Sequence, residues 1–121
     1  MAAVAPVVLD NSSAPHYRWG TGCDGWRLLD EPDLSVIEEQ VPPGAAEVRH
    51  HHATARQFFY VLEGVATLEI DGVVLRLGVG QGAQVVPGQR HRLSNDETWT
   101  LRFLLCSAPS TRGDRFDETA V

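Results

Sequence analysis

The amino-acid sequence predicts an all-β protein built from antiparallel strands, and three observations support this. Short runs rich in Val, Leu, Ile and aromatic residues recur along the chain, with Gly or Pro between them. Two such runs, residues 66–70 and 73–77, alternate apolar and polar positions on either side of an Asp71-Gly72 pair. No window sustains apolar residues at helical spacing. Many short strands separated by turn residues are typical of a sandwich or a small barrel.

The predicted strands follow one another closely. In chain order they cover residues 26–30, 34–41, 57–63, 66–70, 73–77, 84–86 and 98–106. Asp71 and Gly72 can supply the positive φ angles of a two-residue type I′ turn, so the strands that flank them should pair as a hairpin. Residues 34–41 come nearest to a helical pattern, but Val36, Ile37 and Val41 suit a strand as well.

A chain of 121 residues is expected to form one domain. We expect its core at about residues 26–106, between an N-terminal arm at residues 1–15 and a polar C-terminal tail at residues 107–121. The tail could close the mouth of a barrel or pack on a second subunit. A solvated tail is the default expectation.

The charge balance excludes some classes of partner. A formal net charge of −6, with no cluster of Lys and Arg, repels phosphate backbones and anionic lipids, so neither nucleic acid nor a membrane is an expected partner. The apolar N-terminus lacks the basic region of a signal peptide. Cys23 and Cys106 form no Cys-x-x-Cys motif, and we expect them to be reduced thiols in the cytoplasm.

Three consecutive histidines stand out as candidate ligands. Residues two apart on a strand share one face about 6.5 Å apart, so His50 and His52 can converge on one ion while His51 faces away. Gln57 begins the next predicted strand, where the chain could fold back as a hairpin and present it on the same face. His91 follows a Pro-Gly turn and could add a third imidazole. Spacing alone does not favour a metal site over the alternative that these are ordinary surface or hydrogen-bonded histidines.

Two segments resemble the paired motifs of the cupin superfamily. The first reads Gly44-(five residues)-His50-x-His52-(four residues)-Gln57-(six residues)-Gly64, and the second reads Gly80-(five residues)-Val86-Pro87-Gly88-(two residues)-His91-(three residues)-Asn95. The resemblance spans at least residues 34–106 and implies an antiparallel double-stranded β-helix, the jelly-roll barrel of cupins. It also implies a divalent metal ion on His50, His52, Gln57 and His91, for which zinc, nickel, manganese and iron are candidates.

The sequence departs from the cupin pattern at two positions. Val86 stands in place of a proline, and Gln57 in place of the first motif's glutamate. An amide oxygen can coordinate a cation but brings no negative charge, so the ion would be a stronger Lewis acid. This suits isomerase, lyase or cyclase chemistry on a small oxygen-rich substrate, and the ligand set resembles that of cupins that linearise unsaturated uronates and of polyketide-cyclase-like cupins. A dioxygenase and a non-catalytic ligand-binding cupin are the alternatives.

The expected substrate contacts come from two strands. Phe59 shares its parity with Gln57 and is a candidate wall of the pocket, with ordinary core packing as the alternative. In residues 98–106, Arg102 and Cys106 share one face, and Arg102 could bind a substrate carboxylate if that face lines the lumen. The interpretation we favour is a solvated Arg102 and a buried, apolar Cys106. The sugar-converting cupins use an acid on this last strand, and this strand has none.

Small cupins commonly form homodimers, so the resemblance also implies a second copy of this chain as a partner. The apolar N-terminal arm is the segment that could be donated across the interface.

Overall fold

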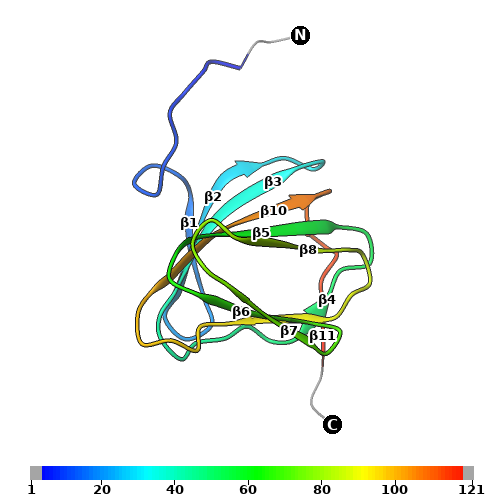
Figure 1. Ribbon diagram of the computed structural model, residues 1–121. Coiled ribbons are helices and arrows are strands. Elements are labelled where there is room, and N and C mark those ends of the chain that lie inside the picture. The colour runs from blue at the N-terminus through cyan, green and yellow to red at the C-terminus, as the bar shows by residue number, and fades with distance from the viewer. Residues whose placement is uncertain (1–3, 119–121) are drawn as a thin grey trace.

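Two antiparallel sheets face each other in the computed structural model, which describes residues 4–118 (Figure 1). The six-stranded sheet has the order β1-β2-β3-β10-β5-β8, and the five-stranded sheet has the order β11-β4-β9-β6-β7. The strands are β1 His16–Trp19, β2 Cys23–Asp30, β3 Ser35–Val41, β4 His50–His51, β5 Arg56–Glu63, β6 Ala66–Ile70, β7 Val73–Leu77, β8 Gly82–Val85, β9 His91–Ser94, β10 Leu101–Ala108 and β11 Phe116–Asp117. The all-β, antiparallel prediction is confirmed. Within the described residues no helix could cross a membrane.

The predicted hairpin is present as β6 and β7. Ile70 pairs with Val73, and the two residues between them have positive φ angles, 47° at Asp71 and 87° at Gly72. Positive φ at both central positions is what a type I′ turn requires, and its twist matches that of the flanking strands. The Asp71 side chain also accepts a hydrogen bond from the Arg90 backbone N–H at 3.0 Å, which ties the turn to the start of β9.

The inward side chains of the large sheet change from apolar to polar along three neighbouring strands. On β10, Leu101 and Phe103 are buried in the core, whereas Ser107 is a buried polar residue. On β5 the same order runs from Val61 to Gln57, and β3 runs from Val41 to Ser35, with the buried Glu39 between Val41 and Ile37. Burial of each large apolar side chain contributes roughly 1.5–3 kcal/mol. The hydrophobic core therefore fills one end of the barrel, and the polar groups gather at the other.

The two chain ends differ from each other. Residues 4–13 are exposed and extend away from the barrel, as expected of an arm (Figure 1). The C-terminal tail, up to residue 118, is largely exposed but lies against the barrel, because β10 continues to Ala108 and β11 pairs with β4. Its pairing with β4 fits a tail that closes the mouth of the barrel.

Candidate metal centre

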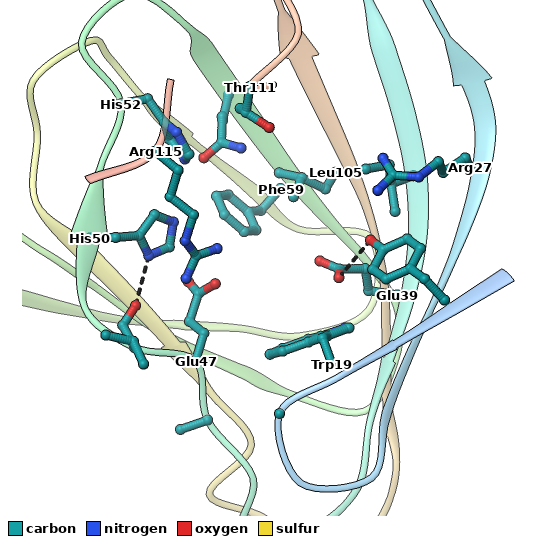
Figure 2. A pocket seen from close by; sticks show the side chains of 16 residues that line it. Trp19, Arg27, Glu39, Glu47, His50, His52, Phe59, Leu105, Thr111 and Arg115 are labelled. Atoms are coloured by element: carbon teal, nitrogen blue, oxygen red, sulfur yellow. Dashed lines mark hydrogen bonds between the residues drawn. The ribbon is translucent and has the colours of Figure 1, made fainter. Parts of the chain in front are cut away.

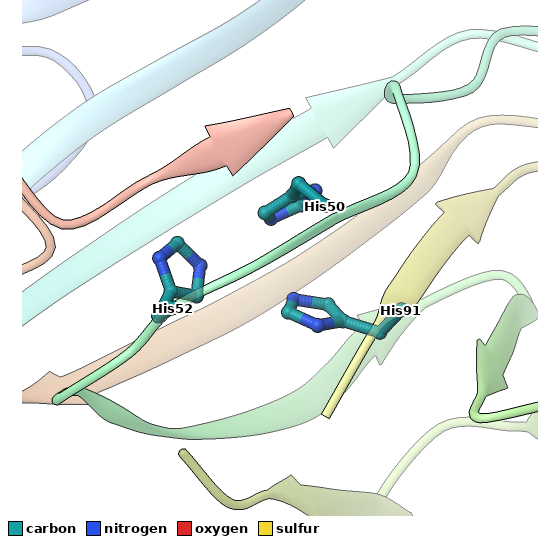
Figure 3. Close-up of side chains that lie close together, drawn as sticks. All are labelled: His50, His52 and His91. Carbon is teal, nitrogen blue, oxygen red and sulfur yellow. The ribbon is translucent and has the colours of Figure 1, made fainter. Parts of the chain in front are cut away.

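Three histidines converge because two neighbouring strands of the small sheet present them together. His50 on β4 is paired in register with His91 on β9, and His52 follows two residues later on the same face (Figure 3). The ring centroids lie 4.3 Å apart for His50 and His91, and the candidate ligand atoms of all three residues lie within 4.8 Å of one another. His51 faces away, as predicted, and stacks on Phe116 at a centroid distance of 5.1 Å.

Backbone carbonyls fix the orientation of all three rings. Nδ1 lies 2.7 Å from the Val48 carbonyl in His50, 2.6 Å from the Asp114 carbonyl in His52 and 3.0 Å from the Gln89 carbonyl in His91. A carbonyl oxygen only accepts, so each Nδ1 carries the proton and each Nε2 keeps its lone pair. Nε2 of His52 and of His91 is buried with no hydrogen-bond partner among residues 4–118. Metal-binding imidazoles show this tautomer and this orientation.

Burial also keeps these imidazoles neutral. It lowers the pKa of His50 to about 3, and it lowers the pKa of His52 and His91 as well, because a charged ring loses its solvation inside the barrel. The hydrogen bond to a backbone carbonyl opposes the shift in each case. At neutral pH the cluster therefore offers three uncharged nitrogen donors without competition from protons.

Gln57 reaches the same region from the opposite sheet. The expected hairpin between residues 50–52 and 57–63 is wrong: β4 pairs with β9 and β11, while β5 pairs with β10 and β8. The short connection between β4 and β5 instead crosses from one sheet to the other. The Gln57 amide nitrogen donates to the Ser107 hydroxyl at 3.1 Å, and its buried Oε1 has no partner among the described residues. The oxygen of this amide is thus the free group.

The C-terminal tail supports the cluster through Asp114, a role that the sequence did not reveal. Its carbonyl accepts from His52, and its carboxylate accepts from the backbone N–H groups of Ala53, Thr54 and Ala55 at 2.8–3.3 Å. These backbone hydrogen bonds lower the pKa of Asp114 against the opposing effect of desolvation. One residue therefore fixes both the His52 ring and the connection between the sheets.

A cavity of about 340 Å³ opens beside the histidines, a volume suited to a small molecule (Figure 2). Phe59 lines it, as expected for its parity with Gln57. Its other chemistry-bearing residues are the aromatic Tyr17 and Trp19, the cationic Arg27 and Arg115, the acidic Glu39 and Glu47, and the candidate ligands His50, His52 and Gln57. Sequence reasoning missed both acids because it sought one on the last strand, whereas Glu39 lies on β3 and Glu47 follows it.

The two carboxyl groups hold their protons unusually well. Burial raises the pKa of Glu39 to about 7, although the Tyr17 hydroxyl opposes this by donating to Oε2 at 3.0 Å. Burial, with a smaller contribution from the charge of Glu39, raises the pKa of Glu47 to about 8. The backbone N–H of Leu93 donates to Glu47 Oε1 at 3.0 Å. Carboxyl groups with such pKa values can give or take protons near neutral pH.

Arg102 does not line the cavity, so the structure gives no support to a substrate-binding role for it. Its guanidinium donates to Glu38 at 3.1 Å and lies 3.6 Å from Glu63 on the outer face of the large sheet. Cys106 shares that outer face, and Leu105 is the β10 residue that lines the cavity. The guanidinium groups that do line it belong to Arg27 and Arg115.

Comparison with known proteins identifies the family. Residues 37–107 match the family model described as a cupin domain. The chain belongs to the cupin family. Its double-stranded β-helix agrees with this, since solved cupins superpose on most of the chain. A polyketide cyclase, RemF from Streptomyces resistomycificus, has a TM-score of 0.81 at 19% identity, over 97% of this chain and 88% of RemF.

Three further relatives differ in what their names state. This cupin is 30% identical over 117 residues to the tetracenomycin polyketide synthase protein TcmJ of Streptomyces glaucescens, a match covering 90% of this chain and 74% of TcmJ. A sugar phosphate isomerase of the cupin superfamily from Silicibacter pomeroyi has a TM-score of 0.74 at 24% identity, over 86% of this chain and 76% of the isomerase. An uncharacterised Methanocaldococcus jannaschii protein is matched over only 60% of its length.

Proposed function

We propose that this cupin is a metal-dependent enzyme of the isomerase, lyase or cyclase type that acts on a small oxygen-rich substrate. His50, His52, Gln57 and His91 would hold a divalent cation, with zinc, nickel, manganese and iron as candidates. The observation that carries the proposal is the set of buried, unpartnered donor atoms, Nε2 of His52 and His91 and Oε1 of Gln57, beside a cavity. A cation there would supply a Lewis acid that polarises a carbonyl or hydroxyl oxygen.

The donor atoms fit a cation, and residues 4–118 offer no hydrogen-bond partner to the buried, unpartnered ones. All four donors are neutral, since the imidazoles are deprotonated at Nε2 and Gln57 offers an amide oxygen. A buried acceptor without a partner costs about 1–3 kcal/mol, and three such groups pointing into one region favour a ligand that satisfies them together.

The cavity residues have separate tasks in this proposal. Trp19 and Phe59 offer flat apolar faces against which a planar substrate can pack. Arg27 and Arg115 offer guanidinium groups that suit an anionic or strongly polar oxygen. Two of the relatives are named for polyketide chemistry and one for sugar isomerisation, which supports a polyketide or a sugar derivative as substrate class.

The two cavity acids favour catalysis over a module that only binds a ligand. A carrier or sensor gains nothing from two carboxyl groups whose pKa values lie near 7 and 8, because burial of such groups is destabilising. A proton-transfer enzyme requires groups of this kind. The neutral donor set also disfavours an oxidised metal, which supports non-redox chemistry over a dioxygenase.

The test is anaerobic turnover by protein loaded separately with each candidate metal. An unsaturated uronate, an enediol sugar and a phenolic polyketide are supplied, and products are followed by mass spectrometry. We expect conversion without oxygen, lost in His52→Ala together with the metal and retained in His51→Ala, the matched control. Conversion that requires oxygen would support a dioxygenase. Retention of a ligand without conversion would support a binding module.

A further inference from the structure

A tyrosine, a glycine and a glutamate lie in line across three neighbouring strands at the wall of the cavity. Tyr17 on β1 is the register partner of Gly25 on β2, and Gly25 is the register partner of Glu39 on β3. A Cβ atom at Gly25 would overlap Cζ and Oη of Tyr17. The phenol therefore lies directly over the bare backbone of Gly25, and only glycine leaves room for it to cross β2.

This crossing brings the phenol to the carboxyl group. The Tyr17 hydroxyl donates to Glu39 Oε2 at 3.0 Å, and the Arg27 guanidinium lies over the Tyr17 ring at 4.6 Å from its centroid. Within residues 4–118 this is the hydrogen bond that Glu39 receives, so Oε1 remains free. Glu39 lines the cavity and lies across it from His50 and His52 (Figure 2).

We propose that Glu39 is the catalytic carboxyl group that moves a proton on the substrate, and that Tyr17 and Gly25 are its positioning residues. The proposal rests on the proposed function, since it needs a substrate oxygen polarised on the opposite side of the cavity. Glu47, whose Oε1 accepts from the Leu93 backbone N–H, is the weaker candidate because it lies on the same side of the cavity as His50 (Figure 2). Glu39 instead faces His50 and His52 from the opposite wall, and it combines this position with a fixed orientation and a free oxygen, the features a proton acceptor needs.

The step is a proton transfer that needs no oxidant or reductant. The Glu39 carboxylate takes a proton from the carbon next to the substrate carbonyl, so a C–H bond breaks and an O–H bond forms on Glu39. The C–H electron pair becomes the second bond of a C=C, and the carbonyl π pair moves to oxygen as an enolate. Glu39 then returns the proton to another carbon or to an oxygen of the same molecule, which completes an isomerisation or prepares a ring closure.

The charges around Glu39 come from every element that packs against it. Tyr17 on β1, Arg27 on β2 and Arg115 in the C-terminal segment all act to lower the pKa of Glu39, against the larger effect of burial. Glu47 and Cys23 are the other titratable neighbours, and the charge of Glu39 raises the pKa of both. Loss of the Tyr17 hydroxyl should therefore raise the pKa of Glu39.

The test uses metal-loaded protein and dihydroxyacetone, a small carbon acid, with hydrogen–deuterium exchange in D₂O followed by proton NMR. We expect the wild type to catalyse exchange and Glu39→Gln to lose it by about 10²–10⁴-fold. Glu38→Gln, which alters the next residue on the outer face, should keep the wild-type rate. Tyr17→Phe and Gly25→Ala should both move the midpoint of the pH–rate profile upward, a shift that a merely structural role would not produce. If Gly25→Ala does not fold, Tyr17→Phe alone tests the positioning role.

Metal content and the absorption spectrum of the Co²⁺-loaded protein separate the two proposals. If cobalt binds and dihydroxyacetone alters its spectrum, but the wild type catalyses no exchange or Glu39→Gln exchanges at the wild-type rate, the role of Glu39 is overturned and the metal proposal stands. If His50, His52 and His91 hold no metal, the proposed function fails, and the role of Glu39 fails with it. All Glu39, Tyr17 and Gly25 variants should retain the wild-type metal content.

Discussion

At the scale of single residues, the hydrogen bond that each histidine donates from Nδ1 leaves its Nε2 unprotonated and able to bind a metal. Val48, Gln89 and Asp114 contribute only backbone carbonyls, so their side-chain identity is irrelevant to the tautomer. The motif spacing predicted His50, His52 and His91 as a group, and the fold brings them together. The motif spacing could not predict Glu39 or Glu47. These acids lie near the histidines only because of how the two sheets pack, and no local spacing encodes that packing.

The lowered imidazole pKa values predict how metal affinity depends on pH. A free imidazole is protonated below about pH 6.5 and would then compete with the cation. Burial lowers the pKa of His50 to about 3 and also lowers the pKa of His52 and His91, so at pH 6 the cluster binds fewer protons than three free imidazoles would. We expect the Kd for Zn²⁺, measured by chelator competition, to change less than about threefold between pH 8 and pH 6. A tenfold or larger weakening over this range would contradict the assignment.

At the scale of structural elements, local chemistry predicted some connections and missed others. The β6–β7 hairpin was predictable because Asp71 and Gly72 encode its turn within two residues. The connection from β4 to β5 was not, since a short polar link between two strands is compatible with a hairpin or with a crossing between sheets. The tail was missed for a similar reason: the strand β11 has two residues, and its partner β4 lies more than 60 residues earlier in the chain.

The tail makes a specific prediction through Asp114. In Asp114→Ala the backbone N–H groups of residues 53–55 lose their acceptor, at a cost of about 1.5–3 kcal/mol for hydrogen bonds to a charged group. The Asp114 carbonyl that orients His52 remains in this variant, but the tail that carries it loses its carboxylate contacts and is held less firmly, so metal affinity should fall about 10–100-fold. Thermal unfolding and metal titration check both effects, with Asp33→Ala in an exposed loop as the control. Wild-type affinity in Asp114→Ala would show that the tail does not support the site.

At the scale of the whole molecule, the buried carboxyl groups link stability to pH. Glu39 and Glu47 bind protons in the folded state up to pH values of about 7 and 8, whereas unfolded glutamates release them near pH 4.5. The folded state thus binds more protons, and stability falls as pH rises through this window. The lowered histidine pKa values act in the opposite direction, and this effect fades above about pH 6.5 as the unfolded imidazoles lose their remaining protons.

Between pH 6.5 and 8 the carboxyl effect is the larger of the two, because the folded pKa values of Glu39 and Glu47 lie inside this interval. We expect the metal-free protein to lose roughly 1–2 kcal/mol of unfolding free energy across this interval, measured by urea denaturation. Glu39→Gln should reduce the loss, because the amide does not titrate. A stability that is flat or rises between these pH values would mean that the two carboxyl groups are already ionised.

We propose that the intact molecule is a homodimer that uses its N-terminal arm. Val4 and Val8 are each 91% exposed, and Phe58 and Tyr60 present further apolar surface on the outer face of the large sheet. Exposed apolar groups of this kind are typical of an interface. Light scattering after gel filtration should give twice the monomer mass, and deletion of residues 1–13 should shift the protein toward monomer. A monomeric full chain at tens of micromolar would contradict this.

The central claim is that one divalent cation is shared by His50, His52, Gln57 and His91. X-ray absorption spectroscopy of the protein as purified, at the absorption edge of the metal that elemental analysis finds, tests it most directly. We expect close to one metal per chain, a first shell of nitrogen and oxygen at about 2.0–2.2 Å, and outer-shell scattering from imidazole rings. A protein without stoichiometric metal, or a first shell that is unchanged in His52→Ala, would contradict the account.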